Sequence, residues 1–259
     1  LVRAADKKIR AALDVTLNRR ADMAETHAQT LMTGRTNRQH ALPITFGFKV
    51  AGWIEELSRA VDRLDGGMRR LSVLPFGGAV GAMHAYGTDG KELNARLAAR
   101  LGLAPMIVAG RAVNDIFADY VLQLSLLAMS IERIAGEIYL LMTEEIGEVS
   151  ERLDSGTVGS STMPHKINPK YVVGVLSTAM ELRSIAGTAL ETGRSSHEGD
   201  AAPNQLVSNL LDRAVPLAWT LSQDFAALLD RTQVNTARMA ANAQLSGGAI
   251  ATEQLMMLL

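Results

Sequence analysis

Apolar residues recur at the spacing of an α-helix along most of the chain. In the N-terminal segment, up to a stop at Thr33-Gly34, apolar residues four apart share one helix face: Ile9, Leu13, Leu17 and Ala21. A second pattern runs from about 45 to 64, and the following Asp65-Gly66-Gly67 is expected to weaken or end it. Both segments are therefore predicted to be helices that bury one face.

The longest pattern runs without proline from 113 to about 142. It covers about thirty residues, or about 45 Å of helix at the usual rise per residue. Apolar residues surround much of its middle, which predicts burial on several sides: Val121, Leu122, Leu126 and Met129. The uncharged stretch 120–131 is shorter than the roughly 20 residues that span a bilayer. We expect a central helix of a bundle.

Three more helices are expected. A short one covers 91–101 and ends at Gly102. A long one runs from 169 to about 192, with Asn168 as its cap and Pro169 in its first turn. Another covers 205–229. The patterns predict an all-α chain in which residues 1–259 form a single helical domain around three or four very long helices.

Composition agrees with this fold class and limits the function. Ala, Leu and Met dominate the apolar content and aromatic residues are only 4%, which favours helices over sheets. The net charge of −1 gives no reason to expect nucleic acid or an anionic membrane as partner. The chain has no cysteine, which excludes disulfides and thiolate metal sites. Its five histidines show no metal-binding spacing, so no metal is expected.

The two ends of the chain bear on its length and its location in the cell. It begins at Leu1 without an initiator methionine and closes on an apolar run at 255–259, so we expect it to be part of a larger polypeptide. The first residues are charged and helix-patterned, with no apolar signal-peptide core. We therefore expect a cytoplasmic protein.

The stretch GSSTMPHKINP at 159–169 is the first candidate for chemistry. It is too polar and too rich in glycine and proline to continue a helix, so it is predicted to be a loop. Ser160 and Ser161 are adjacent, so only one hydroxyl is expected to face a given cavity. Lys166 can lower the cost of a serine oxyanion or bind a substrate carboxylate, and Asn168 offers a neutral donor. The alternative is a helix-capping turn with solvated side chains.

Two further polar breaks hold candidate residues. GRTNRQHALP at 34–43 is predicted to be a turn or a strained connection, and Asn37 and His40 would share a face on a helical turn. His40 is a candidate proton shuttle, or a structural residue of the turn. His197-Glu198 is expected to be a solvated loop. The glycine-rich stretch 76–83 lacks a preceding strand and a phosphate-binding lysine, so it indicates close packing.

Three segments together resemble a known family. GSSTMPHKINP closely resembles the signature loop GSSxMPxKxNP of the fumarase/aspartase superfamily, GRT…ALPITFG at 34–47 is similar to a second signature block, and EIGEVSE at 145–151 is similar to the segment before the loop. The resemblance extends from about 3 to 230. It implies a long-helix bundle, a homotetramer with active sites shared between subunits, and an enzyme without a cofactor.

Residues 34–53 are most similar to the 3-carboxy-cis,cis-muconate cycloisomerase branch of this superfamily. The positions that carry this similarity are Gln39-His40-Ala41 and Lys49-x-Ala51-Gly52-Trp53. Most lyases of the superfamily carry histidine after Gly-Arg-Thr, where this chain has Asn37. The chain also departs from related sequences at Ile167 and Gly199, where arginine is often found.

The resemblance implies a reaction and a set of roles. A carboxylate of a tricarboxylate diene would add to a double bond and close a lactone. Ser160 would donate the proton to the adjacent carbon, with Ser161 as the alternative, and His40 would assist. The implied substrate-binding residues are Lys166, Asn168, Arg35, Thr36, Gln39 and Met163. The alternatives are a lyase that releases fumarate from adenylosuccinate or argininosuccinate, and a non-catalytic structural homologue.

Overall fold

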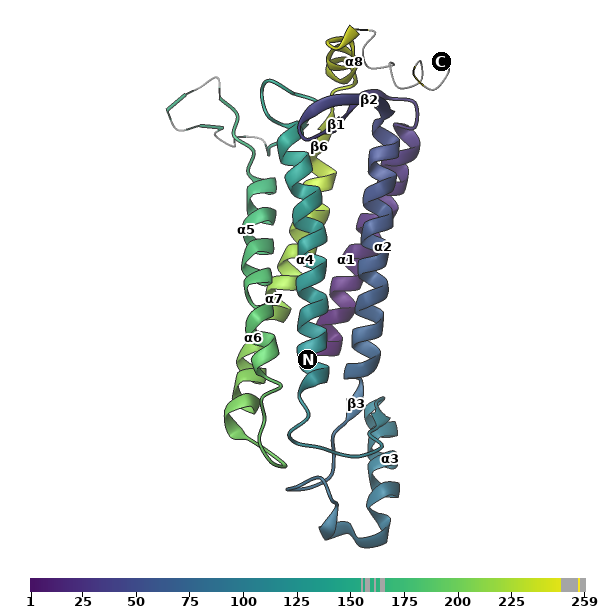
Figure 1. Cartoon of the computed structure of the whole chain (residues 1–259), viewed down its shortest axis with the longest axis vertical. Coiled ribbons are helices and arrows are strands. Elements are labelled where there is room, and N and C mark those ends of the chain that lie inside the picture. The colour runs from purple at the N-terminus through teal and green to yellow at the C-terminus, as the bar shows by residue number, and fades with distance from the viewer. Residues whose placement is uncertain (155, 157–158, 161, 164–165, 248–255, 257–259) are drawn as a thin grey trace. The chain divides into compact units, whose positions relative to one another are not determined.

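The computed structural model describes residues 1–154, 156, 159–160, 162–163, 166–247 and 256. These residues are mostly helical, so the all-α prediction is confirmed (Figure 1). The helices are α1 (Val2–Thr26), α2 (Phe46–Leu71), α3 (Gly90–Leu101), α4 (Asp115–Leu141), α5 (Tyr171–Ser184), α6 (Ala186–Glu191), α7 (Ala201–Arg231) and α8 (Thr236–Gln244), with a 3-10 segment η1 (His84–Asp89).

Short strands form three two-stranded sheets. The strands are β1 (Leu31–Thr36), β2 (Gln39–Thr45), β3 (Val73–Leu74), β4 (Ala104–Pro105), β5 (Val149–Glu151) and β6 (Thr232–Val234). β1 pairs with β2 and β5 with β6 in antiparallel fashion, and β3 pairs with β4 in parallel fashion. None of these strands was expected from the sequence.

The chain divides into two compact units. Unit 1 comprises Leu1–Arg10, Ala60–Met129 and Ala179–Thr220, and unit 2 comprises Ala11–Arg59, Ser130–Thr178 and Leu221–Leu259. The helices α1, α2, α4, α5 and α7 each contribute residues to both units. Whether 1–259 behaves as a single domain remains a prediction.

The core of unit 2 follows the periodicity of the sequence. Its fully buried side chains recur every three or four residues along the helices, among them Leu13 of α1, Val50 and Leu57 of α2, and Ile131, Ile134 and Ile138 of α4. The ring of Phe46, where α2 begins, meets Trp53 edge to face at 6.0 Å. Burying these apolar faces is the main force that holds the helices together.

The core of unit 1 is built around the first half of α4. Tyr120, Leu124 and Leu127 are fully buried. The phenolic O–H of Tyr120 donates to Asp6 at 3.0 Å, and burial and this carboxylate raise the pKa of Tyr120. The middle of α4 is less buried than expected, because Leu126 and Met129 are 37% and 47% exposed in this chain.

Two helix boundaries differ from the prediction. α2 does not end at Asp65-Gly66-Gly67 but continues to Leu71. Gly66 and Gly67 are buried. A Cβ on Gly67 would lie 3.2 Å from the side chain of Gln123, so Gly67 permits close packing against α4. The expected helix from 169 to 192 is instead divided at Ile185 into α5 and α6.

The start of α5 is a further correction, because Asn168 does not cap it and Pro169 precedes it. α5 begins at Tyr171. The Glu151 carboxylate accepts hydrogen bonds from the backbone N–H groups of Lys170, Tyr171 and Val172 at 2.7, 3.1 and 2.7 Å. A carboxylate at this position satisfies unpaired amides and interacts favourably with the helix dipole. Among the described helices, none is long and apolar enough to cross a membrane.

Candidate active site

Residues 34–43, which were expected to form a turn or a strained connection, lie in a β-hairpin. Thr36 pairs with Gln39 across a two-residue turn, and Arg35 pairs with His40. The turn residues Asn37 and Arg38 have φ of 49° and 64°, both left-handed. Such a turn matches the twist of the strands, and asparagine tolerates it. The hairpin therefore presents Arg38 at its tip, and Asn37 and His40 share no helical face.

Arg35 is engaged by a buried carboxylate. Its two terminal nitrogens donate to Glu148 at 2.9 and 2.6 Å. Glu148 is fully buried and also accepts a hydrogen bond from the side-chain amide of Asn242 at 2.8 Å. A buried carboxylate requires such pairing because the desolvation of its charge is costly. The role of Arg35 in substrate binding remains a prediction, and the structure shows its guanidinium in an ion pair.

A first cavity, here called the hairpin cavity, lies beside β1 and β2 in unit 2. It has a volume of about 390 Å³. Its lining residues are Arg35, Arg38, His40, Glu137, Leu140, Leu141, Glu145, Ile146, Asn242 and Leu245. His40 Nδ1 lies 2.7 Å from the hydroxyl of Ser246, which leaves Nε2 for other partners. The lining combines charged and polar side chains with the apolar side chains of Leu140, Leu141, Ile146 and Leu245.

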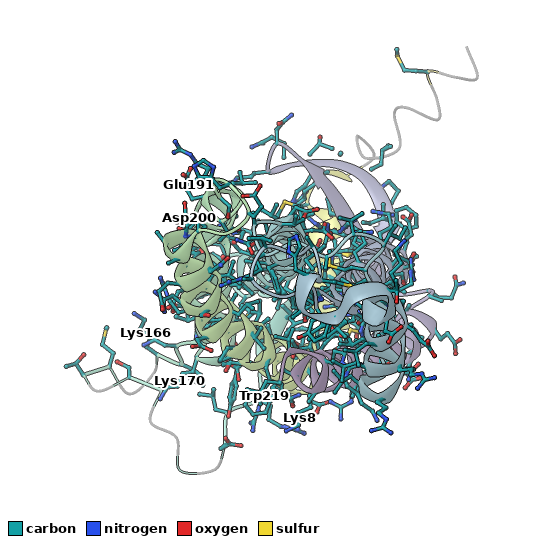
Figure 2. All side chains as sticks on the ribbon, turned by 90° about the horizontal axis from the view of Figure 1, so that it is seen from below. Lys8, Lys166, Lys170, Glu191, Asp200 and Trp219 are labelled. Atoms are coloured by element: carbon teal, nitrogen blue, oxygen red, sulfur yellow. The ribbon has the colours of Figure 1, made fainter. Side chains whose placement is uncertain are left out.

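A second cavity of unit 2, here called the loop cavity, is larger, with a volume of about 820 Å³. Its lining residues are Arg38, Gly136, Tyr139, Leu140, Met142, Thr143, Glu144, Lys166, Ile167, Asn168 and Pro169. It brings two predicted substrate-binding residues, Lys166 and Asn168, to the same space as Arg38. Lys166 lies on the segment that leads into α5 (Figure 2). Within the described part of the chain, Arg38 makes no hydrogen bond or ion pair.

The signature segment is non-helical at every position that the structure describes, so the loop prediction is confirmed there. The Ser160 hydroxyl accepts hydrogen bonds from the N–H of Met163 at 3.1 Å and, more weakly, of Thr162 at 3.4 Å. Two N–H donors on one oxygen stabilise negative charge there. Ser160 and Met163 line neither cavity, and Ser161 lies outside the described residues.

The two ends of the signature segment approach each other. The N–H of Asn168 donates to the carbonyl of Gly159 at 3.4 Å. A Cβ on Gly159 would lie 2.7 Å from the carbonyl oxygen of Lys166 and 3.0 Å from the Cα of Ile167, so only glycine fits. This close approach explains why the segment starts with glycine.

A polar cluster fixes the flank of the signature segment. The O–H of Tyr171 and the guanidinium of Arg231 donate to the two oxygens of Asp154 at 2.6 and 2.7 Å. The guanidinium also lies 4.1 Å from the centre of the Tyr171 ring. These two hydrogen bonds lower the pKa of Asp154. With Glu151 at the start of α5, the cluster anchors both flanks of the segment that carries Lys166 and Asn168.

The remaining candidates are placed elsewhere. Thr36 and Gln39 lie beside the hairpin turn with exposed side chains and line neither cavity. His197 and Glu198 are exposed in unit 1 and line a cavity of about 350 Å³ with Arg111. In the described part of the chain, no group of three histidine, aspartate or glutamate side chains could hold a metal ion.

Arg38 is the site residue that the sequence patterns did not single out. It lines both cavities. The available signal was a two-residue turn beginning with asparagine and flanked by residues that can form strands. Pro43 and the dense polar residues of 34–40 obscured that signal, because they are also typical of an irregular connection.

The sequence of this chain is similar to those of known lyases. A sequence model of a family described as "Lyase" matches residues 1–181. The chain is 34% identical to the N-acetyl-S-(2-succino)cysteine lyase of Dickeya dadantii, over 90% of this chain and 52% of that protein. It is 35% identical to the adenylosuccinate lyase of Methanothermobacter thermautotrophicus, over 90% of this chain and 53% of that protein.

A third relative has a different reaction in its name. The chain is 35% identical to the 3-carboxy-cis,cis-muconate cycloisomerase of Pseudomonas aeruginosa, over 90% of this chain and 51% of that protein. The chain thus spans about half the length of the curated relatives it matches.

Two solved structures share the fold. The fumarate lyase from Mesorhizobium sp. BNC1 and the 3-carboxy-cis,cis-muconate lactonizing enzyme from Pseudomonas putida each superpose with a TM-score of 0.89 at 29% identity. Each match covers 99% of this chain, and 57% and 56% of the respective structures.

Proposed function

Because this chain belongs to the lyase family of the fumarase/aspartase superfamily, we propose that its protein is a cycloisomerase. The proposed substrate is 3-carboxy-cis,cis-muconate and the product is 4-carboxymuconolactone. The relative from Pseudomonas aeruginosa and the structure from Pseudomonas putida support this choice by name, and the similarity of residues 34–53 to that branch supports it by sequence.

One observation carries the proposal: a cation of the hairpin and a cation of the signature segment line the same cavity. Arg38 and Lys166 contribute the charges to the loop cavity, and Asn168 adds a neutral amide donor. A substrate with three carboxylates needs several fixed donors that act together. Negative charge also develops next to a carboxylate during the reaction, and fixed positive groups stabilise it there.

The proposed reaction is an intramolecular addition. A carboxylate oxygen of the substrate attacks one carbon of a double bond, and the π electrons move to the neighbouring carbon, next to another carboxylate. Ser160 gives its proton to that carbon, and water restores the serine proton, so one proton is taken up per turnover. The N–H groups of Met163 and Thr162 stabilise the serine oxygen while it is negative.

A fumarate-releasing lyase is the second candidate, and specific relatives favour it. The relatives named as N-acetyl-S-(2-succino)cysteine lyase and adenylosuccinate lyase are 34% and 35% identical to this chain, as near as the cycloisomerase. The chemistry is the reverse of an addition. The Ser160 oxygen would remove a proton next to a carboxylate, and the leaving group would depart with the electrons of its bond to carbon.

We also propose that the protein is a cytoplasmic homotetramer whose active sites combine residues of several subunits. The partly exposed apolar side chains Leu126 and Met129, three residues apart on α4, support burial against another copy. Ser161 and Met163 remain proposed members of such a shared site, together with Thr36 and Gln39.

A parallel assay distinguishes the candidate reactions. The purified protein is given 3-carboxy-cis,cis-muconate, adenylosuccinate, argininosuccinate and N-acetyl-S-(2-succino)cysteine in separate reactions. Loss of diene absorbance in the ultraviolet reports lactone formation, and fumarate is measured for the other three. Lactone formation with little fumarate is expected. Fumarate from one succinyl substrate with no lactone selects the second candidate, and turnover of none rejects both.

The proton-transfer role of Ser160 has its own test. Ser160→Ala is expected to lower kcat by about 100-fold or more, because general acid–base catalysis contributes a factor of this size. The matched control is Ser184→Ala, whose hydroxyl donates to the Glu181 carbonyl on the exposed surface of α5, and its kcat should be unchanged. Wild-type kcat in Ser160→Ala would refute the role.

A further inference from the structure

Glu148, in the segment between α4 and β5, connects the hairpin with α8 in unit 2. Its carboxylate accepts two hydrogen bonds from Arg35 of β1 and one from Asn242 of α8. Its own backbone carbonyl accepts from the N–H of Asn235, which caps α8. Among the described residues, the hydrogen bonds of this fully buried carboxylate lead to the hairpin and to α8.

Several hydrogen bonds hold α8 against residues 145–148, the segment that contains Glu148. Asn242 also donates to the Ile146 carbonyl at 2.9 Å. Arg238 donates to the carbonyls of Ile146 and Glu145 at 3.0 and 2.8 Å. Because these contacts fix α8 to residues 145–148, they also fix the orientation of the Asn242 amide toward the Glu148 carboxylate.

The residues just after α8 contact the other strand of the hairpin. Ser246 lies two residues beyond the end of α8, and its hydroxyl is 2.7 Å from His40 Nδ1 in β2. Leu245 and Asn242 line the hairpin cavity beside His40. The segment 242–246 thus holds β1 through Glu148 and β2 through His40, on either side of the turn that presents Arg38.

We infer that Asn242 and Ser246 are positioning residues of the active site, which act through Arg35 and His40. Asn242, with Glu148, sets where the hairpin tip places Arg38. Ser246 holds Nδ1 of His40, so that Nε2 is the nitrogen free to act. This inference rests on the proposed function, because it assigns these residues to the site formed by the hairpin and the signature segment.

The physical reason is preorganisation. A hairpin with a two-residue turn is marginally stable alone and takes its place from what it packs against. Misplacement of a charged group by about 1 Å can cost about 100-fold in rate, and a ring that rotates freely loses its alignment. Hydrogen bonds that fix both strands therefore affect turnover as well as folding.

A purely structural role would give a different result, and Asn94 provides the comparison. Asn94 is buried like Asn242, at 2% and 3% exposure, and its side-chain amide donates to the Phe76 carbonyl at 2.7 Å. It belongs to unit 1, whereas Asn242 and the hairpin belong to unit 2. Asn94→Ala should therefore show the cost of losing a buried amide without any effect on the site.

The test compares kcat and KM of Asn242→Ala, Ser246→Ala, Ser246→Thr and Asn94→Ala, with whichever substrate the protein turns over. Asn242→Ala should raise KM about tenfold through Arg38. Ser246→Ala should lower kcat about tenfold, and Ser246→Thr, which keeps the hydroxyl, should restore most of it. Asn94→Ala should change neither constant. Equal effects of the Asn242 and Asn94 variants, or of both Ser246 variants, would overturn the inference.

A second readout does not depend on the reaction. In protein labelled with ¹⁵N-histidine, the Nδ1 resonance of His40 should shift in Ser246→Ala and remain near its wild-type position in Ser246→Thr. An unchanged His40 resonance in Ser246→Ala would overturn the role of Ser246. If no substrate is turned over, the proposed function fails, yet this measurement still decides whether Ser246 holds His40.

Discussion

At the scale of single residues, Glu148 supports the hairpin as a fully buried carboxylate that accepts hydrogen bonds from Arg35 and Asn242. Its removal leaves the Arg35 guanidinium largely buried without a counter-ion. Glu148→Ala is expected to lower the free energy of unfolding by about 3–5 kcal/mol, which urea titration measures.

An exposed ion pair provides the control. Glu92→Ala removes the i,i+4 partner of Arg96 on α3, where both side chains are largely exposed. It is expected to change the free energy of unfolding by no more than about 0.5 kcal/mol. A loss below about 1 kcal/mol in Glu148→Ala would show that the buried pair is not needed for stability.

The burial of Arg20 was not predicted from the sequence. It is fully buried between the rings of Trp53 and Phe225, 5.4 and 4.6 Å from their centres, and its nitrogens have no hydrogen-bond partner among the described residues. Burial lowers the pKa of Arg20 to about 9; the charge of Arg133 acts in the same direction and that of Glu56 opposes it. The folded protein therefore holds the charge of Arg20 less favourably than the unfolded chain does.

Arg20→Met is expected to raise the free energy of unfolding by about 1–2 kcal/mol at pH 7.5, because the desolvation cost exceeds the cation–π attraction that is lost. Above about pH 9 the folded protein releases the Arg20 proton while the unfolded chain, whose arginine has its ordinary higher pKa, still holds it. Wild-type stability therefore gains in this window, and the advantage of the variant should shrink. Urea titrations at pH 7.5 and 10.5 check both signs; an advantage that grows with pH would contradict the argument.

At the scale of elements, the β1–β2 hairpin can be separated from the charge at its tip. Arg38 has a positive φ of 64°, which glycine adopts without strain. Arg38→Gly is expected to keep or slightly raise stability and to raise KM for a polycarboxylate substrate about tenfold to hundredfold, the worth of one charge-assisted contact.

Thermal unfolding and steady-state kinetics measure these two effects. Asn37→Gly is the matched control, since it relaxes the same turn and keeps the cation. A KM that is unchanged in Arg38→Gly would remove Arg38 from the site.

The elements also show where local patterns were sufficient. The short helix ending at Gly102 was expected, and Gly102 has a left-handed φ of 63° and donates its N–H to the carbonyls of Ala98 and Ala99. The start of α5 was not predicted. Its cap is the carboxylate of Glu151, which lies 19 residues before Lys170, the first residue whose N–H donates to it. When the capping side chain comes from a distant part of the chain, the sequence around the helix start contains no signal for that cap.

At the scale of the whole molecule, the proposed tetramer makes a prediction about α4. Met129→Arg places a charge on the partly exposed apolar face that includes Leu126. If that face is buried between copies, the variant should show a lower mass by light scattering than the wild-type tetramer. Leu93→Arg, at a partly exposed position on α3, is the control. Equal masses for Met129→Arg and wild type would place the interface elsewhere.

The sequence by itself determined the long helices, the loop and the family, because helical periodicity is local and the signature residues are contiguous. Only the tertiary structure decided the partners of the site residues. Arg35 meets Glu148, 113 positions away, and Lys166 shares a cavity with Arg38, which no spacing along the chain predicts. The signature segment identified the family, and the packing of hairpin, α4 and α8 decided which charges lie around the described part of that segment.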